Sequence, residues 1–504
     1  MVNLFITASR YIMILLILLY TFSNFRSLSI PDQDEANAFA RWQFRIILLI
    51  HFLSNCIIYI KTMDLRAVLF YLGQLLFLLL YTLLAKKLYH NCNRLLLNNV
   101  CLFITYGLIM LERLDFDKAI KQFVIILASA AVSLLIPFLI DKIWDLVKWR
   151  YIFAVLGLLL LTSVLFVGVT SYGAKMSISI GGMSFQFSEI VKITFVLCIG
   201  GMLSRAGSFR DILITAAVGA AHMLILVACK DLGSALIFFL AFIIMLYIST
   251  SKGIYLFLGS AAAALAGVFS YQMFSHVRTR IFAWQNPWAD IDNKGYQITQ
   301  SLFAIGTGGF FGLGLYQGMP YKIPIVEKDF IISAISEEMG AITAICLTLI
   351  CLGCFMQMMV IATYMEYSFY KLVSVGLAIE YIVQVFLTVG GAVKFIPSTG
   401  VTLPFVSYGG SSLVSSFIVF SIIQALYIIQ GNEDEADALA AEQQGSGAGF
   451  DGDALYEADA DDDRDIPYEE DADDDGDALY EADTDYDGDE YEEDGSGSGE
   501  DRRR

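Results

Sequence analysis

Long apolar stretches recur along most of this 504-residue chain, separated by short polar segments. An α-helix needs about 20 predominantly apolar residues to cross the roughly 30 Å hydrocarbon core of a bilayer. The pattern therefore predicts an all-α polytopic membrane protein with thirteen spans, twelve and fourteen being alternatives because several stretches are short. The predicted spans lie near residues 5–24, 45–61, 67–85, 98–112, 122–140, 151–171, 189–204, 210–228, 234–250, 254–274, 331–363, 369–391 and 411–430.

Basic residues are concentrated in alternate connecting segments. Because cytoplasmic loops are enriched in Lys and Arg, we expect the richer set to be cytoplasmic. This orientation places the amino terminus and the 275–330 loop outside and the carboxyl-terminal tail inside. The richer set comprises Arg26, Arg41, Arg45, Lys86, Lys87, Arg94, Lys142, Lys148, Arg150, Arg205, Arg210, Lys252 and Lys371.

Composition divides the chain into two unlike parts. The whole is 57% hydrophobic with a mean hydropathy of +0.63 and a net charge of −19. Residues 431–504 hold 31 acids and four arginines, a balance of −27, whereas the remaining 430 residues have a balance of +8. The tail repeats "DGDALYEAD" at 451–459 and 475–483 and has few apolar residues, so we expect it to be disordered.

The loop at 275–330 has a different character. It is rich in aromatic residues and contains a dense glycine series from Gly306 to Gly318. Aromatic residues at this density favour a packed surface or a membrane interface. We therefore expect a structured loop with short amphipathic helices on the outer face of the membrane.

Ionisable residues next to apolar spans indicate candidate sites. In "QFSEIVK", Ser188 is predicted to cap a helix, with Glu189 in its first turn and Lys192 on the same face. Asp231 begins another apolar helix. A cap and an interfacial ion pair without further function are an equally good interpretation of these residues.

Two arginines lie at the outer end of a predicted span. Arg278 and Arg280 precede the aromatic loop, and guanidinium groups bind phosphates in a bidentate manner. A lipid-linked phosphate or pyrophosphate is therefore a natural ligand. The alternative is that these side chains only anchor the helix end at the interface.

The stretch "EKDFIISAISEEMG" brings three acids into an apolar segment. With Asp329 at a helix start, Ser333 and Ser336 fall on its face, which predicts a polar stripe. Glu337 lies deeper along the same helix and is predicted to line the crevice behind Asp329. Glu338 points to the opposite side and needs a partner on another helix. A capping aspartate with two structurally paired glutamates is an equally good interpretation.

The stretch from Val393 to Val414 contains two prolines and three glycines, so a continuous helix is excluded. Broken backbone at membrane depth is tolerated only where it is buried in protein or lines a wet cavity. We expect this segment to line a site, although a purely structural re-entrant loop is the alternative. Its candidate binding residues are Lys394, Ser407 and Ser411.

Over roughly residues 98–430 these motifs resemble the SEDS family of bacterial cell-wall polymerases, the FtsW/RodA/SpoVE type. "QFSEIVK" is similar to the family's Q-P-S-E-x-x-K, and "KDLGSA" to its Q-P-D-L-G-T-A. "EKDFIISAISEEMG" and "IPSTGVTLPFVSYGGSS" match two further family motifs, and the 286–315 stretch resembles its loop signature. Phe187, Lys230 and the segment Ala174–Met176 depart from the family pattern.

The resemblance implies a ten-helix glycosyltransferase domain at 98–430, preceded by three extra spans at 1–97 and followed by the acidic tail at 431–504. It implies an enzyme of the bacterial cell membrane that polymerises lipid II into glycan strands during division, elongation or sporulation. A class B penicillin-binding protein and other division or elongation proteins are the implied partners, with no nucleic acid. By motif match Asp329 is the catalytic residue, and Glu189, Lys192, Asp231 and either Arg278 or Arg280 are candidate cavity or substrate contacts. We expect Glu337, Lys394, Ser407 and Ser411 to be further substrate contacts.

The predicted mechanism uses Asp329 as a general base on the acceptor sugar hydroxyl. The leaving pyrophosphate would be met by basic side chains and a divalent cation, Mg²⁺ or Mn²⁺, with no organic cofactor. A flippase or transporter for the lipid-linked precursor is the alternative function, because buried acids and a broken helix would also serve a translocation path. A non-catalytic scaffold is a third possibility.

Overall fold

A computed structural model describes residues 2–30, 33–143, 145–171, 174–180 and 183–447. The chain divides into two units, Met1–Glu442 and Gln443–Arg504, and every helix and strand below begins in the first. Both copies of the acidic repeat lie outside the described residues. The last helix, α16, extends to Gly447 and so passes the predicted domain boundary at residue 431. The predicted disorder of the acidic tail stays a prediction.

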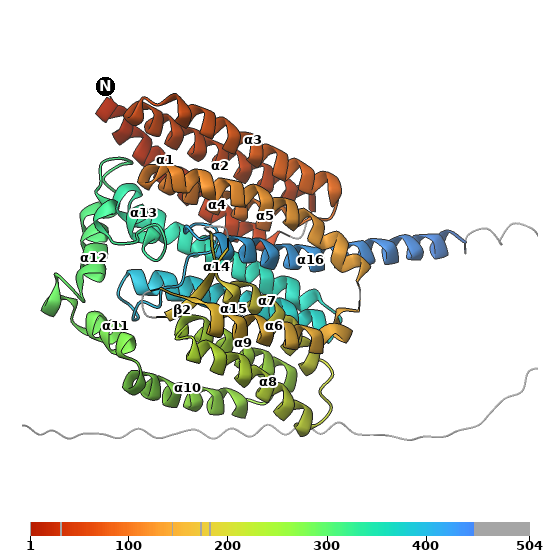
Figure 1. Ribbon diagram of the computed structural model, residues 1–504. Helices are drawn as coiled ribbons and strands as arrows, with labels where there is room; N and C mark the ends of the chain where they lie inside the picture. Colours follow the sequence, from red (N-terminus) through yellow and green to blue (C-terminus); the bar gives the residue numbers. More distant parts are fainter. Residues whose placement is uncertain (1, 31–32, 144, 172–173, 181–182, 448–504) are drawn as a thin grey trace, which may run out of the picture. The chain divides into compact units, whose positions relative to one another are not determined.

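Three helices precede the predicted catalytic domain, as the apolar pattern indicates. They are α1 (Val2–Arg26), α2 (Gln33–Thr62) and α3 (Leu65–Leu88). In Figure 1 they lie together on one side of the bundle, where α1 packs against α2 and α14, and α2 packs against α4.

The remaining long helices form the bundle that carries the site. The most buried of them is α4, and α7 packs among α6, α8, α9 and α15. These helices are α4 (Arg94–Leu114), α5 (Phe116–Lys142), α6 (Arg150–Val167), α7 (Phe187–Leu203), α8 (Phe209–Ala228), α9 (Leu232–Thr250), α10 (Ile254–Met273), α14 (Ala341–Tyr364), α15 (Ser368–Ala392) and α16 (Gly410–Gly447).

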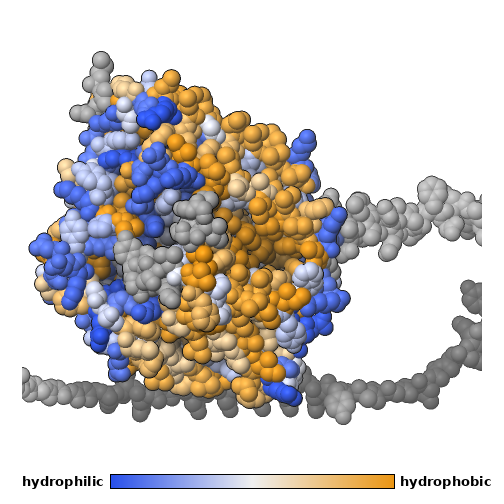
Figure 2. Space-filling view, viewed as in Figure 1, coloured by the Kyte–Doolittle hydropathy of each residue, from blue (hydrophilic) through white to orange (hydrophobic). Residues whose placement is uncertain are grey.

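Within the described residues, twelve helices are long and apolar enough to cross a membrane. The predicted span near residues 189–204 has no counterpart among these twelve: it corresponds to α7, of whose 17 residues 13 are buried inside the bundle. Figure 2 shows a broad hydrophobic surface between hydrophilic residues at the two ends of the bundle. This distribution is the one that a bilayer requires.

A small antiparallel sheet joins α6 to α7, which the sequence pattern does not predict. Its strands are β1 (Val169–Ser171), β2 (Ala174–Ile180) and β3 (Met183–Phe185), in the order β1-β2-β3. The pairing of Ile178 with Phe185 brings the chain back to the start of α7.

The 275–330 loop is structured and contains short helices, as predicted. It comprises α11 (Ser275–Gln285), a 3₁₀ turn at Pro287–Asp290, α12 (Tyr296–Gly308) and a second 3₁₀ turn at Pro320–Lys322. Further short 3₁₀ turns lie at Ser27–Ser29 and Leu146–Trp149.

The predicted single span at 331–363 is wrong, because the structure divides it into α13 (Ile331–Met339) and α14. Asp329 does not begin a helix: Phe330 occupies the N-cap position, and no side chain caps α13. The break lies at Gly340, which has a φ of +95°. The chain at Phe310–Gly312 passes so close that a Cβ on Gly340 would lie 2.5 Å from the Phe310 carbonyl oxygen.

This close approach makes Gly340 intolerant of a side chain. We expect Gly340→Ala to lower the free energy of unfolding by about 2–3 kcal/mol, since both the positive φ and the contact with Phe310 oppose a Cβ. Thermal unfolding of the purified protein in detergent measures this loss. The matched control is Gly267→Ala in α10, where a Cβ meets no atom within 4 Å. Equal unfolding temperatures for the two variants would contradict this account of the break.

Candidate active site

Asp329 is held by the closing segment, the non-helical chain from Val393 to Gly409. The Ser407 hydroxyl donates to the Lys328 carbonyl oxygen at 2.5 Å, and the Tyr408 amide donates to the Glu327 carbonyl oxygen at 2.7 Å. The two residues before Asp329 are therefore fixed by backbone contacts. Asp329 is half-buried in the turn that leads into α13.

Arg280 approaches the same place from α11. Its guanidinium donates to the Thr399 carbonyl oxygen at 2.8 Å. The next residue, Gly400, has a φ of +78°, and a Cβ there would lie 3.3 Å from Arg280 Nη2 and 3.8 Å from Asp329 Oδ2. Gly400 thus leaves room for the carboxylate and the guanidinium beside one stretch of backbone.

Burial and charge act on Asp329 in opposite directions. Desolvation raises the pKa of its carboxyl to about 6, while the positive charges of Arg280 and Lys328 limit that rise. Burial also lowers the pKa of the Arg280 guanidinium, and the charge of Asp329 opposes this effect. A carboxyl group with a pKa near neutrality is suited to accept a proton.

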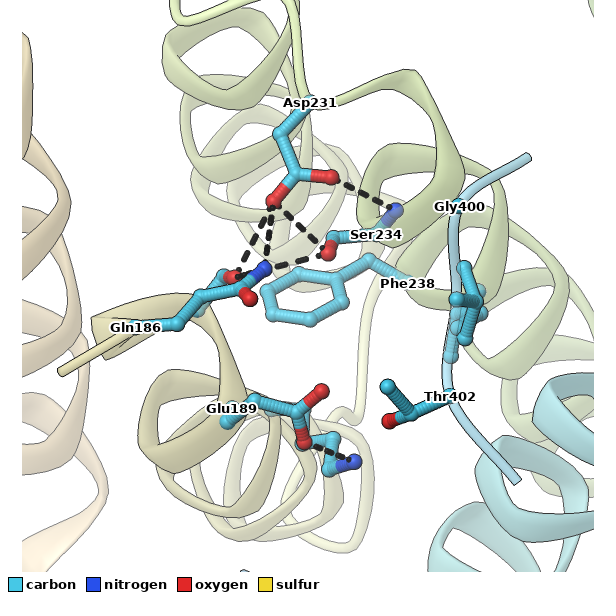
Figure 3. A pocket seen from close by; sticks show the side chains of 11 residues that line it. Gln186, Glu189, Asp231, Ser234, Phe238, Gly400 and Thr402 are labelled. Atoms are coloured by element: carbon cyan, nitrogen blue, oxygen red, sulfur yellow. Dashed lines mark hydrogen bonds and ion pairs between the residues drawn. The ribbon is translucent and has the colours of Figure 1, made fainter. Parts of the chain in front are cut away.

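Gly400 connects Asp329 to a polar cavity between α7, α9 and the closing segment (Figure 3). The cavity encloses about 30 Å³, which accommodates one or two water molecules. A sugar or a pyrophosphate therefore requires it to open. Its lining residues are Gln186, Ser188, Glu189, Lys192, Asp231, Ser234, Ile237, Phe238, Gly400, Val401 and Thr402.

One side of the cavity is built around Asp231, the N-cap of α9. Its carboxylate accepts hydrogen bonds from the Ser234 amide at 3.2 Å and the Ser234 hydroxyl at 2.8 Å. Ser188 and Gln186 also donate to it, at 3.1 and 3.3 Å. The predicted capping role of Ser188 is wrong: Ser188 lies inside α7, and its hydroxyl is directed to the neighbouring helix.

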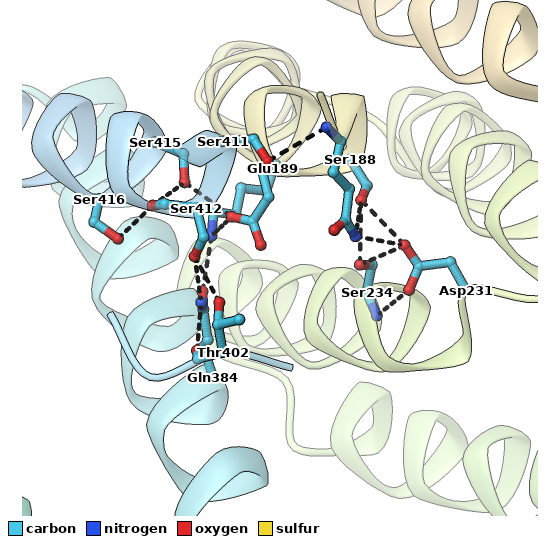
Figure 4. A network of polar contacts seen from close by, with 12 residues as sticks. Ser188, Glu189, Asp231, Ser234, Gln384, Thr402, Ser411, Ser412, Ser415 and Ser416 are labelled. Carbon is cyan, nitrogen blue, oxygen red and sulfur yellow. Dashed lines mark hydrogen bonds and ion pairs between the residues drawn. The ribbon is translucent and has the colours of Figure 1, made fainter. Parts of the chain in front are cut away.

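The other side is built around Lys192, and Figure 4 shows its partners Glu189 and Gln384 together with Ser415. Its ammonium group donates to Glu189 at 2.6 Å and to Gln384 of α15 at 2.7 Å. Ser415 donates to the same Glu189 oxygen at 2.9 Å. Gln384 in turn donates to the Thr402 carbonyl oxygen at 2.9 Å. The predicted Glu189–Lys192 pair is confirmed, and it joins α7, α15, α16 and the closing segment.

The sequence interpretation missed two polar residues of α15. Gln384 is the second partner of Lys192, and Glu380 is 2% exposed, with neither carboxylate oxygen hydrogen-bonded among the described residues. Both interrupt the apolar stretch "AIEYIVQVF". A polar residue in a span is a signal for a buried site, so this signal was available.

The other predicted substrate-binding residues differ in how close they lie to the cavity. Ser411 accepts from the Gln186 amide at 3.3 Å and so borders the cavity, whereas Arg278 is exposed. Lys394 has a φ of +61°, and its carbonyl oxygen accepts from Trp284. Ser407 acts through its hydrogen bonds to the backbone of Lys328 and Leu403.

Glu337 is not among the residues that line the cavity. One of its oxygens accepts from the Met319 amide at 2.8 Å, and the other is buried without a partner among the described residues. Glu338 is fully buried and forms an ion pair with Arg113 of α4 at 3.0 Å. The prediction that Glu338 pairs with another helix is therefore confirmed.

The described acidic side chains of the candidate site do not form a metal-binding cluster. No three His, Cys, Asp or Glu side chains gather to hold a metal ion in the part of the chain that the structure describes. Both Asp231 and Glu189 already accept hydrogen bonds from nearby donors. The predicted divalent cation stays a prediction.

The fold and the site together define a multi-spanning helical membrane protein with an acid–base cluster beside an unwound segment. Residues 93–429 match the cell cycle protein family FtsW/RodA/SpoVE, and the chain belongs to this family. The match confirms the resemblance drawn from the motifs. It begins just before α4, so α1, α2 and α3 lie outside it.

Curated relatives of the chain are peptidoglycan glycosyltransferases. Over 359 residues it is 33% identical to RodA of Mycobacterium tuberculosis (strain ATCC 25618 / H37Rv), covering 65% of this chain and 76% of that protein. Over 279 residues it is 33% identical to a probable FtsW of Geobacter sp. (strain M18), covering 53% and 74%. A solved chain from a peptidoglycan synthase complex matches with a TM-score of 0.57 at 23% identity, over 67% of this chain and 98% of that one. This last likeness confirms the all-helical membrane fold.

The ion pair between Glu189 and Lys192 is expected to contribute to the stability of the fold. We expect Lys192→Met to lower the free energy of unfolding by about 3 kcal/mol or more, because Glu189 would remain buried without its cation. The double variant Lys192→Met/Glu189→Gln should recover part of that loss. Thermal unfolding in detergent compares the two. A double variant no more stable than the single one would show that the pair is not energetically coupled.

Proposed function

We propose that this protein is a peptidoglycan glycosyltransferase that polymerises lipid II at the outer face of the bacterial cytoplasmic membrane. The observation that carries the proposal is the Asp329–Arg280–Gly400 arrangement, in a chain that belongs to the FtsW/RodA/SpoVE family. A desolvated carboxylate beside a guanidinium provides a base and a phosphate ligand within one site.

In the proposed reaction, Asp329 removes the proton from the acceptor sugar hydroxyl. The hydroxyl oxygen attacks the anomeric carbon of the donor, the new glycosidic bond forms, and the bond to the pyrophosphate breaks. With a pKa of about 6, Asp329 is ionised at neutral pH. Its proton affinity is still higher than that of an exposed aspartate, which favours base catalysis.

The leaving polyprenyl pyrophosphate carries the negative charge. Among the described residues, Arg280 donates to one backbone carbonyl oxygen, that of Thr399, which leaves other guanidinium N–H groups for phosphate oxygens. Lys192 and exposed Arg278 are further candidate contacts. A divalent cation would enter with the pyrophosphate, since Mg²⁺ is commonly held by one or two carboxylates together with substrate phosphates.

The small cavity implies that donor binding changes the structure. Gly400 of the closing segment lines the cavity that holds Asp231 and Lys192, and a Cβ on Gly400 would lie 3.8 Å from Asp329 Oδ2. We propose that the donor enters as this segment and α9 move apart. The hydrogen bonds of Gln186, Ser188 and Gln384 would then be exchanged for substrate contacts.

The proposed partner is a class B penicillin-binding protein that cross-links the glycan product, alongside other division or elongation proteins. Support for it comes from the structural neighbour, which belongs to a complex described as coordinating polymerization and crosslinking. The outer-face location is supported by the bias of Lys and Arg toward alternate loops. The amino-terminal part of α1 and the glycine-rich loop touch one another at one end of the bundle, as that orientation requires.

The experiment compares Asp329→Asn with the wild-type protein, each purified and supplied with lipid II in detergent. We expect glycan polymerisation to fall by at least about a hundredfold, as is typical for loss of a general base. The fold should be retained, because no described side chain relies on Asp329 for a hydrogen bond. The matched control is Asp117→Asn, an exposed acid at the start of α5, which should polymerise normally.

Polymerisation by Asp329→Asn at the wild-type rate would refute the assignment of the base. The flippase alternative is separated by the same assay, because detergent leaves no membrane to cross. A wild-type protein that forms no glycan in detergent, even with its transpeptidase partner, yet moves the precursor across vesicles, would favour that alternative.

A further inference from the structure

The glycine-rich loop from Gly309 to Met319 forms a cap on α13. The amides of Leu313 and Gly314 donate to the carbonyl oxygens of Glu337 and Glu338, at 2.9 and 2.8 Å. These carbonyls lie in the last turn of α13, where a helix has no internal donors for them. The loop therefore supplies hydrogen bonds that a continuing helix would otherwise have made.

The side chains of the same two glutamates bind the loop in return. Glu337 accepts from the Met319 amide at 2.8 Å, and Glu338 accepts from the Tyr316 amide at 3.1 Å. The loop and α13 thus form one hydrogen-bonded body. Because α13 begins two residues after Asp329, movement of this body also moves Asp329.

Two arginines attach this body to the rest of the bundle. Arg113 of α4 forms the ion pair with Glu338 and also donates to the Gly318 carbonyl oxygen at 3.3 Å. Arg10 of α1 donates to the Gly312 carbonyl oxygen at 2.7 Å. Arg113 lies within the family match at 93–429, whereas Arg10 lies outside it.

Packing around Arg10 supports a specific contact. Ile6, one turn earlier in α1, is 2% exposed and lies 3.0 Å from where a Cβ on Gly314 would be. The Tyr11 ring lies 5.7 Å from the Phe311 ring, and the second Arg10 amino group donates to the Tyr11 hydroxyl at 2.9 Å. A partly buried guanidinium with two oriented acceptors costs less entropy per bond than a free side chain would.

We propose that α1 is a positioning element of the active site, acting through Arg10 on the Gly309–Met319 loop. Arg10 is a positioning residue: among the described residues it donates to Gly312 and Tyr11 rather than to Asp329, and it fixes the loop that fixes α13. Helix α1, which lies outside the family match, is then part of the catalytic unit rather than an accessory to it. The effect on catalysis rests on the proposed function, but the contact itself does not.

The test compares Arg10→Gln, Arg10→Lys and wild type as full-length purified proteins. Hydrogen–deuterium exchange is followed in peptides that cover 309–319 and 331–339, and lipid II polymerisation is measured on the same samples. We expect Arg10→Gln to exchange faster in these two segments alone, and its turnover to fall by roughly fivefold to tenfold through loss of a charge-assisted hydrogen bond. Arg10→Lys keeps the charge and an N–H donor group but loses the guanidinium fork that reaches two acceptors, so it should lie between the two.

The matched control is Arg26→Gln at the other end of α1, where the guanidinium lies over the Phe39 ring. Exchange at 309–319 and turnover should both stay at wild-type levels in this variant. Unchanged exchange at 309–319 in Arg10→Gln would overturn the proposal. A uniform rise in exchange across α4, α7 and α15 would also overturn it, because that pattern means global destabilisation. A wild-type protein without polymerase activity would count against the proposed function, while the exchange measurement would still decide whether Arg10 holds the loop.

Discussion

The polar backbone of the closing segment, Val393–Gly409, has to find hydrogen-bond partners inside an apolar bundle, and the site is built from those partners. Backbone that is neither helix nor strand is stable at membrane depth only where its N–H and C=O groups are paired. The Thr399 carbonyl oxygen accepts a hydrogen bond from Arg280. The carbonyl oxygens of Val401 and Thr402 accept hydrogen bonds from two side chains of α15, Thr388 and Gln384. At its far end the segment returns hydrogen bonds to the backbone that precedes Asp329. The hydrogen bonds that pair the backbone of the closing segment therefore bring α11, α15 and the Asp329 turn together.

The same requirement explains the break between α13 and α14. A continuous helix would satisfy its own carbonyls, but here the glycine-rich loop supplies the donors instead. The positive φ of Gly340 and the close passage of Phe310 make this exchange possible. The result is a short, fully buried helix that carries two glutamates without exposing either to lipid. The glycine-rich loop, α13 and the Asp329 turn are consequently expected to move together.

Features local in sequence could be predicted, whereas features that depend on distant packing could not. The Glu189–Lys192 pair follows from their spacing on one helix, and the need of Glu338 for a partner follows from its direction. The non-helical closing segment follows from its prolines and glycines. Ser188 was misassigned because its partner, Asp231, belongs to a different helix. The division at Gly340 was missed because it depends on a chain segment about 30 residues earlier.

The amino-terminal helices show the same limit. Periodicity predicts that they are spans, but it does not show that Arg10 reaches Gly312, some 300 residues away in the sequence. The reaction could be inferred only from the order of the family motifs. The hydrophobic pattern alone is equally compatible with a polymerase, a flippase and a scaffold protein. The structure then distinguishes among the predicted substrate contacts. Arg280 lies beside Asp329, whereas Arg278 is exposed and Glu337 binds the glycine-rich loop.

Burial raises the pKa of Asp329 and the charge of Arg280 limits that rise, so that the carboxylate is a base with a pKa of about 6. The most direct measurement is the pH dependence of lipid II polymerisation for wild type and for Arg280→Gln. A base must be deprotonated to act, so wild-type activity should fall as the pH drops through about 6. Because the positive charge of Arg280 lowers the pKa of Asp329, its removal should move this fall to higher pH, whatever the height of the remaining activity. A wild-type rate that does not change between about pH 5 and 8, or a fall at the same pH in both proteins, would contradict the account.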